Sequence, residues 1–352
     1  MTIEAKGYAA ASSTAALEPY SFERREPLEQ DVVIEILYCG VCHSDIHSVR
    51  NEWHSSKYPL VPGHEIIGTV SAIGNKVSKY KVGDLVGVGC LVDSCRHCSA
   101  CDEDLEQYCE NGFTGTYNAS DKVGGTTHKT TLGGYSNVII VDEQFVLRIP
   151  ENLNQAAAAP LLCAGITTYS PLKHWKVGKG TQVGIIGLGG LGHMGVKFAH
   201  AMGAEVIMIT TSPEKGEDAK KLGANDVLLS TDMQAMMTAQ NSFDFLLNTI
   251  PVGHDVDPYL ALLKRDATMV IVGAVEPLKQ VNGAGLIFKR RDIAGSLIGG
   301  IEETQEMLDF CGKHGITCDI EEINIKDINT AYERTVKGDV KYRFVIDMSS
   351  LQ

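Results

Sequence analysis

The sequence lacks the features of a secreted or membrane-spanning protein. Its first residues, 1–6, do not show the basic and then apolar run of a signal peptide. The longest apolar stretch, around residues 156–166, is interrupted by Pro160 and is too short to span a bilayer. We therefore expect a cytoplasmic protein with no membrane partner.

An excess of positive charge is also missing. The chain has 31 Lys and Arg residues against 44 Asp and Glu residues, which gives a formal net charge of -13. This balance repels phosphate backbones, so nucleic acid is not expected as a partner. A local basic spot can still bind a small phosphate group.

The length of the chain predicts two domains, because 352 residues are more than one hydrophobic core usually serves. The part up to about residue 150 is rich in short β-type runs at 31–38, 68–74, 82–88 and 136–141. Glycine and proline separate these runs at short intervals, which favours a compact β-barrel over a helical domain.

After Pro150 the pattern changes to apolar runs that alternate with helical stretches. Six runs read as strands, at 181–186, 205–209, 226–229, 243–247, 268–272 and 292–296. Strands that alternate with helices predict a doubly wound parallel sheet. The C-terminal residues leave this pattern. We therefore expect one domain made of 1–152 with 295–352, and a nucleotide-binding domain over 153–294.

A glycine-rich turn lies between the first of these strands and the next helix. Its sequence, Gly187-Leu-Gly189-Gly190-Leu191-Gly192, contains the G-x-G-x-x-G pattern in the context that a dinucleotide site requires. Gly187 permits the tight turn, Gly189 lets the backbone approach a pyrophosphate, and Gly192 allows close packing of helix against strand. The helix N-terminus then offers free N–H groups to phosphates. A glycine turn without a ligand is the alternative.

The choice of cofactor depends on the end of the second strand. About 20 residues after the glycine turn, an acidic side chain would hold the ribose 2′-hydroxyl of NAD. Glu205 stands at the wrong end of that strand, whereas Thr211 and Ser212 follow its carboxyl end, with Lys215 close by. Hydroxyls and a cation suit the 2′-phosphate of NADP(H). Ser212 can also simply cap the next helix, and one residue can do both.

Four of the ten cysteines form a cluster with intervals of two, two and seven residues: Cys95, Cys98, Cys101 and Cys109. Disulfides are a poor explanation in a chain of this length without a secretion signal. Four thiolates in one short lobe suit a closed tetrahedral zinc site with a structural role. An iron–sulfur run would need its fourth cysteine after three residues and then a proline. Free thiols are the remaining alternative.

Three scattered residues form a second candidate metal site. Cys42 and His64 stand in glycine-flanked turns, and Cys163 lies before the first strand of the nucleotide domain. Two thiolates and a neutral imidazole neutralise Zn²⁺ and leave a fourth position open, which is the ligand set of alcohol dehydrogenase. A single buried cysteine or loop histidine is more often structural. The combination with a dinucleotide turn favours metal binding.

Taken together, the glycine-rich turn and the two cysteine-containing sites resemble those of the medium-chain, zinc-containing alcohol dehydrogenase family, and the resemblance extends over essentially the whole length of the sequence. The nearest branch is that of cinnamyl alcohol dehydrogenases and aldehyde reductases. The resemblance rests on the segments around Cys42, His64 and Cys163, on the four-cysteine loop and on the glycine-rich turn. It implies a GroES-like barrel joined to a Rossmann domain, a homodimer, two zinc ions per chain and NADP(H) as cofactor.

The resemblance also implies roles for individual residues. Cys42, His64 and Cys163 bind a catalytic zinc, and Glu65 is an alternative ligand. Ser44 contacts the substrate oxygen, and His47 ends a proton relay. The implied cofactor contacts are Thr167, Gly187, Gly189, Gly190, Leu191, Gly192, Thr211, Ser212, Lys215, Ile298 and Arg343. The chain diverges where substrate would pack, at Trp53, His54, Leu91 and Ile298, so the resemblance does not name the substrate.

The function that follows is hydride transfer between NADP(H) and a primary alcohol or aldehyde, mainly as an aldehyde reductase. An NAD-linked polyol dehydrogenase is the rival within enzymes, and the missing acid after the second strand argues against it. A non-catalytic, nucleotide-sensing relative is the rival from another class. Such a protein would be expected to lose the zinc ligands or the relay, and this chain keeps Cys42, Cys163 and His47.

Overall fold

The computed structural model describes residues 2–124, 128–273 and 276–351. The packing of the backbone divides the chain into two compact units. The first unit contains 1–163 and 299–352, and the second contains 164–298. The sequence-based domain limits, at 152/153 and 294/295, lie near these divisions and stay a prediction.

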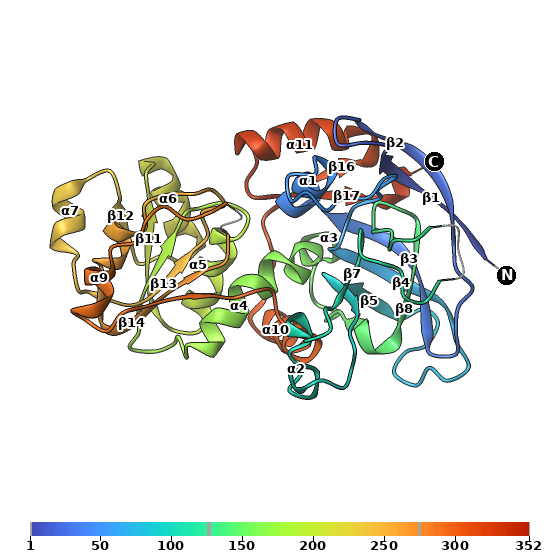
Figure 1. The fold of residues 1–352 in the computed structure, drawn as a ribbon, viewed down its shortest axis with the longest axis horizontal. Helices are drawn as coiled ribbons and strands as arrows, with labels where there is room; N and C mark the ends of the chain where they lie inside the picture. The colour runs from blue at the N-terminus through green and yellow to red at the C-terminus, as the bar shows by residue number, and fades with distance from the viewer. Residues whose placement is uncertain (1, 125–127, 274–275, 352) are drawn as a thin grey trace. The chain divides into compact units, whose positions relative to one another are not determined.

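The first unit is built on a seven-stranded sheet whose central strand is β3 (Asp31–Gly40) (Figure 1). Val32 and Ile34 of β3 are fully buried. The order of six strands is β16 (Ile320–Asn324), β17 (Arg343–Asp347), β3, β4 (Ile66–Ile73), β5 (Leu85–Val88) and β9 (Leu147–Arg148), while β8 (Val138–Asp142) also pairs with β3. Antiparallel pairs dominate this sheet, as the short runs separated by glycine and proline predict.

Smaller elements complete the first unit. A hairpin joins β1 (Ile3–Ala10) and β2 (Leu17–Arg24), and a second short pair joins β6 (Leu91–Asp93) and β7 (Thr114–Gly115). The helices are α1 (His43–Val49), α2 (Ser99–Asp102), α3 (Gln155–Ala158), α10 (Ile301–His314) and α11 (Ile328–Lys337).

The C-terminal part of the chain returns to the first unit through β16 and β17. Strand β17 pairs antiparallel with β3, so that Val345 lies opposite Gly40. This register places Arg343, at the start of β17, next to the carbonyl group of Val41. The last strands of the chain therefore reach the segment that leads into α1.

The second unit is a six-stranded, fully parallel sheet (Figure 1). The strands are β10 (Gln182–Ile186), β11 (Glu205–Thr210), β12 (Asp226–Leu229), β13 (Phe243–Asn248), β14 (Leu263–Ile271) and β15 (Asp292–Gly295), in the spatial order β12-β11-β10-β13-β14-β15. This order reverses at β10, as in dinucleotide-binding sheets. The predicted doubly wound sheet is confirmed.

Helices connect the strands of the second unit. These are α5 (Gly192–Ala201), α6 (Pro213–Leu222), α7 (Met233–Thr238), α8 (Asp257–Leu260) and α9 (Gly283–Ile287), while α4 (Ala164–His174) precedes the first strand. Ile186, Phe243, Leu246 and Met269 form part of the core beneath them. Among the described residues, no helix is both long and apolar enough to cross a membrane.

Candidate metal and nucleotide sites

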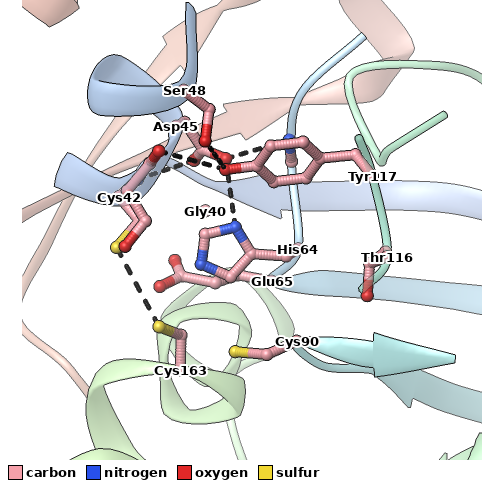
Figure 2. Close-up of polar contacts among 12 residues, drawn as sticks. Gly40, Cys42, Asp45, Ser48, His64, Glu65, Cys90, Thr116, Tyr117 and Cys163 are labelled. Carbon is pink, nitrogen blue, oxygen red and sulfur yellow. Dashed lines mark hydrogen bonds and ion pairs between the residues drawn. The ribbon is translucent and has the colours of Figure 1, made fainter. Parts of the chain in front are cut away.

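Three distant segments of the first unit bring four possible metal ligands together. Cys42 precedes α1, His64 and Glu65 precede β4, and Cys163 follows the 3₁₀ turn η3 (Ala159–Leu162). One ligand atom of each residue lies within 4.8 Å of the others. The Sγ atoms of Cys42 and Cys163 are 3.9 Å apart, and Figure 2 marks this contact with a dashed line. The fold, and not the spacing of the residues along the sequence, therefore brings these four possible ligands together.

The buried carboxylate of Asp45 joins the segments that carry Cys42 and His64 (Figure 2). It accepts hydrogen bonds from the backbone N–H groups of Cys42 and Gly63 and from Nδ1 of His64, each at 3.0 Å. With Nδ1 occupied, Nε2 is the nitrogen of His64 that is left for a metal. Burial lowers the pKa of His64, but Asp45 together with the Cys90 and Cys42 thiols outweighs that effect and holds the pKa well above its usual range.

Glu65 is fully buried and forms an ion pair with Arg343 of β17. Its Oε1 accepts from the guanidinium, whereas Oε2 has no hydrogen-bonding partner among the described residues. Burial raises the pKa of Glu65 to about 7, and Arg343 opposes that rise. Gly40 is required here, because a Cβ atom at this position would lie 1.9 Å from Oε2. An unpaired buried carboxylate oxygen beside two thiols fits a neighbouring cation.

The donor chemistry of the cluster fits zinc. The Cys163 thiol is hydrogen-bonded to Cys42, which lowers the pKa of Cys42 well below its usual value and raises that of Cys163. Zinc prefers thiolate and imidazole ligands, and three protein ligands leave a coordination position open for chemistry. A third thiol, Cys90, lies next to Cys163 in Figure 2 and contacts the carbonyl oxygen of Leu162 at 3.6 Å.

The four-cysteine loop forms a second, separate cluster in the first unit. The sulfur atoms of Cys95, Cys98, Cys101 and Cys109 lie within 4.8 Å of one another. Backbone N–H groups of Cys95 and Glu110 point to two of these sulfur atoms, each at 3.4 Å. Four thiolates fill a tetrahedral zinc site completely, so this arrangement suits a structural metal.

The residues expected in the proton relay lie on α1. His47 pairs through Nδ1 with Glu52, and the centroid of its ring lies 5.6 Å from that of His43 and 5.4 Å from that of Trp53. Ser44 stands two residues after Cys42 in the first turn of the helix. In the part of the chain that the structure describes, no hydrogen bond joins the Ser44 hydroxyl to His47. Glu52 was not among the residues predicted from the sequence.

Tyr117 is another residue that sequence reasoning missed. Its hydroxyl donates to the carbonyl oxygen of Ser44 at 3.1 Å and contacts the Ser48 hydroxyl at 3.2 Å. The Tyr117 ring lies 5.7 Å from the ring of His64 (Figure 2). Tyr117 therefore holds α1 against the segment that carries His64. Nothing in its sequence context signals this contact, because Tyr117 is distant from both segments along the chain.

In the second unit, the glycine-rich turn follows β10 directly and leads into α5. Gly187 has a φ of +90°, which favours glycine, and a Cβ on Gly192 would lie 1.9 Å from the Gly187 carbonyl oxygen. A Cβ on Gly189 would meet nothing within 4 Å, so the space beside this residue is open to a ligand. Gly190 and Leu191 complete the turn before the helix. This cradle fits a pyrophosphate at a helix N-terminus.

The end of β11 carries the predicted 2′-phosphate residues. Ser212 is the N-cap of α6, and its hydroxyl accepts from the backbone N–H of Lys215 at 3.3 Å. Thr211 lies between β11 and this cap. The helix-capping alternative for Ser212 is thus observed, and capping leaves the hydroxyl proton free for a second contact.

The other predicted contact residues are found in both units. Thr167 is buried on α4 of the second unit, and Ile298 is buried with a φ of +35°. Arg343 is buried in the first unit, where it donates to the Val41 carbonyl oxygen at 2.8 Å in addition to Glu65. Of the positions expected to face substrate in the first unit, Leu91 is buried, while Trp53 and His54 are exposed.

A dinucleotide-type sheet in one unit and an open thiolate–imidazole site in the other define a metal-dependent dehydrogenase. Comparison with known proteins gives the same class. The family description "Alcohol dehydrogenase GroES-like domain" matches residues 28–151, and "Zinc-binding dehydrogenase" matches residues 190–313.

Relatives match over the whole chain. Aldehyde reductase YahK from Escherichia coli is 58% identical over 355 residues, which cover 100% of this chain and 99% of the relative. A cinnamyl alcohol dehydrogenase structure from Sorghum bicolor has a TM-score of 0.95 with 44% identity, and covers 99% of each chain. The structure of CAD from Helicobacter pylori complexed with NADP(H) has a TM-score of 0.93 with 44% identity, and covers 100% of each chain.

The chain belongs to the zinc-containing medium-chain alcohol dehydrogenase family, in the branch of cinnamyl alcohol dehydrogenases and aldehyde reductases. It is an oxidoreductase, and the predicted fold, a GroES-like domain with a Rossmann domain, is confirmed.

The two clusters predict two zinc ions per chain with unequal roles. We expect Cys163→Ala to abolish turnover while the fold is retained, because it removes a ligand of the open site. Cys98→Ala should mainly lower the thermal unfolding temperature, since structural zinc binding adds to folding free energy. A nicotinamide absorbance assay measures the turnover of Cys163→Ala, while elemental analysis and thermal unfolding measure the metal content and stability of both purified variants. A wild-type protein with a single metal ion, or with iron, would contradict the assignment.

Proposed function

We propose that the protein uses NADP(H) to interconvert primary alcohols and aldehydes, and that it works mainly as an aldehyde reductase. The observation that carries the proposal is the cluster of Cys42, His64 and Cys163, whose donors suit an open zinc site. The names of its relatives support the same reaction and cofactor. A panel of aromatic and short aliphatic aldehydes with NADPH, followed by nicotinamide absorbance, tests the proposal directly.

The residues have separate roles in this reaction. When bound, zinc supplies a Lewis acid beside the substrate oxygen, and the nicotinamide cofactor carries the hydride. Cys42, His64 and Cys163 hold the metal, and Glu65 is positioned as an alternative ligand through its unpaired Oε2. Ser44 hydrogen-bonds the substrate hydroxyl. In oxidation the proton leaves toward His47, and in reduction the same residue returns it.

His47 is suited to the end of this relay. Its Nδ1 is held by Glu52, so Nε2 is the atom that exchanges the proton. The rings of His43 and Trp53 are both in contact range of the imidazole. Imidazole is the side chain that most readily gains and loses a proton near neutral pH, which suits it to passing protons to solvent.

The two alternative functions would require different residues at these positions. An NAD-linked polyol dehydrogenase would favour an acid at the end of β11, where this chain has Thr211 and Ser212. A non-catalytic relative would not need an intact metal cluster together with His47. Metal analysis combined with the NADPH assay separates these possibilities.

The first prediction from this proposal concerns the cofactor. Charge-assisted hydrogen bonds from Ser212 and Lys215 to the 2′-phosphate contribute about 1.5–3 kcal/mol, or roughly 10- to 150-fold in affinity. We therefore expect kcat/KM to be at least about tenfold higher with NADPH than with NADH. Ser212→Asp should reverse or erase this preference, because it adds a negative charge where the phosphate sits.

The matched control for this prediction is Ser212→Asn. Aspartate and asparagine both cap helices well, so the start of α6 should be preserved in both variants. Only the aspartate adds repulsion. Equal use of NADH and NADPH by the wild-type enzyme would refute the assignment of Thr211, Ser212 and Lys215 and leave the zinc chemistry intact.

The relay gives a second prediction. We expect His47→Gln to lower alcohol oxidation by about 10²–10⁴-fold, and most strongly near neutral pH, because it removes a general base. The measurement is the pH dependence of kcat/KM for the two enzymes. An unchanged profile in the variant would exclude His47 from the proton path.

We further propose that the protein is a cytoplasmic homodimer. Strand β15 is an edge of the parallel sheet in the second unit, with β14 as its only neighbour among the described strands. Ile287 and Phe288, at the end of α9, are 77% and 84% exposed. An unpaired strand edge, and large exposed apolar side chains at the end of the helix that precedes this strand, favour association with a second copy.

This dimer can be tested by charge substitution. Phe288→Glu should shift the protein from dimer toward monomer in analytical ultracentrifugation, because a carboxylate would be buried at the interface. Met233→Glu is the control, since Met233 is 78% exposed on α7, next to β12 at the opposite edge of the sheet. Dissociation by both variants, or by neither, would argue against this interface.

A further inference from the structure

The loop that carries His64 is held by a neighbouring segment, residues 133–135. Three backbone hydrogen bonds join the two. Gly133 donates to the carbonyl oxygen of Val61 at 2.8 Å, and Gly134 donates to that of Gly63 at 2.9 Å. Tyr135 donates to the carbonyl oxygen of Pro62 at 2.9 Å. The position of the residue just before His64 is therefore fixed by segment 133–135.

The ring of Tyr135 packs closely against Gly63 in this loop. Tyr135 is fully buried. Gly63 has a φ of +103°, and a Cβ atom on Gly63 would lie 2.6 Å from Cδ1 of the Tyr135 ring. Only glycine leaves room for the ring at this point and also adopts this backbone conformation. The glycine before His64 is thus explained by Tyr135 and not by contact with a ligand.

The hydroxyl of Tyr135 reaches the carboxylate of Asp45, to which it donates at 3.3 Å. The other three donors to Asp45 are the N–H groups of Cys42 and Gly63 and the ring of His64. A carboxylate accepts about four hydrogen bonds, so this buried group is satisfied only with Tyr135 included. Tyr135 is the one donor that does not lie in a segment leading to a metal ligand.

We propose that Tyr135 is a positioning residue for the catalytic metal centre. Its hydroxyl completes the hydrogen bonds of Asp45, and Asp45 in turn orients Cys42 and His64. This inference rests on the proposed function, because it assumes that these two residues bind the metal. Without the hydroxyl, one oxygen of a dry, buried carboxylate loses a partner, so Asp45 moves toward its remaining donors and draws both ligand segments with it.

The expected effect is a loss of metal affinity. Replacement of groups that orient metal ligands typically weakens metal binding by about 10- to 100-fold. Tyr135 acts through Asp45, so we expect Tyr135→Phe to weaken metal binding by about tenfold, at the lower end of that range. Asp45→Asn should give the larger loss, because it changes the direct partner of His64.

The chain provides a matched control in Tyr332. Its ring lies 6.5 Å from that of Tyr135 and is similarly buried. The Tyr332 hydroxyl has no hydrogen-bonding partner among the described residues. Tyr332→Phe therefore removes the same atom from the same part of the core without removing a hydrogen bond to Asp45, although the Tyr332 hydroxyl lies close enough to that of Tyr135 to influence its pKa. We expect its metal affinity to match that of the wild-type protein.

The experiment uses the full-length chain. Zinc is removed from the protein and returned in competition with a chromophoric chelator, and the absorption spectrum of the Co²⁺-substituted protein reports the ligand geometry at the cluster of Cys42, His64 and Cys163. Tyr135→Phe should bind zinc about tenfold more weakly and alter the Co²⁺ spectrum. Added zinc should restore its activity toward the wild-type level, which a misfolded variant would not show.

Three outcomes decide the matter. Wild-type affinity and an unchanged Co²⁺ spectrum in Tyr135→Phe would overturn the inference. Equal weakening in Tyr135→Phe and Tyr332→Phe would also overturn it, because the effect would then come from general packing. If Cys163→Ala has the same metal content as the wild-type protein, the proposed open site itself fails, and this result is distinguishable from the other two.

Discussion

The buried carboxylate of Asp45 is the constraint on which the metal cluster depends. A charged group in a dry interior is costly unless donors surround it. Asp45 recruits these donors from the segment before α1, from the loop before β4 and from Tyr135. Two of these segments carry the ligands Cys42 and His64. The same hydrogen bonds that make the burial of Asp45 possible therefore set the distance between the two ligands.

A second buried charge connects the end of the chain to this cluster. Arg343 enters through β17, whose register against β3 is set by the sheet, and it meets Glu65 beside Gly40. Removing either partner of such a pair would leave an uncompensated charge, which is strongly destabilising. The C-terminal segment is therefore part of the metal-binding unit. After residue 298 the chain returns to the first unit, and β17, which carries Arg343, pairs there with β3.

The nucleotide-type features of the second unit are local by comparison. The turn after β10 depends on glycines within six consecutive residues, and the start of α6 depends on Ser212 three residues before its partner Lys215. Such features need only the geometry of one strand, one turn and one helix. The first unit differs, because its cluster joins Cys42 to Cys163 across 121 positions of sequence.

Features that depend only on residues close together in the chain could be predicted from the sequence. Apolar runs that alternate with helical stretches predicted all six parallel strands, glycine spacing predicted the turn at Gly187, and cysteine spacing predicted the four-cysteine cluster. The scattered ligands were identified from their motifs and the family resemblance. Only the tertiary structure revealed that Asp45, Tyr117 and Tyr135 lie around these ligands and that Glu52 contacts His47. The physical reason is that these contacts depend on strand register and loop packing between distant segments, which no spacing within the sequence encodes.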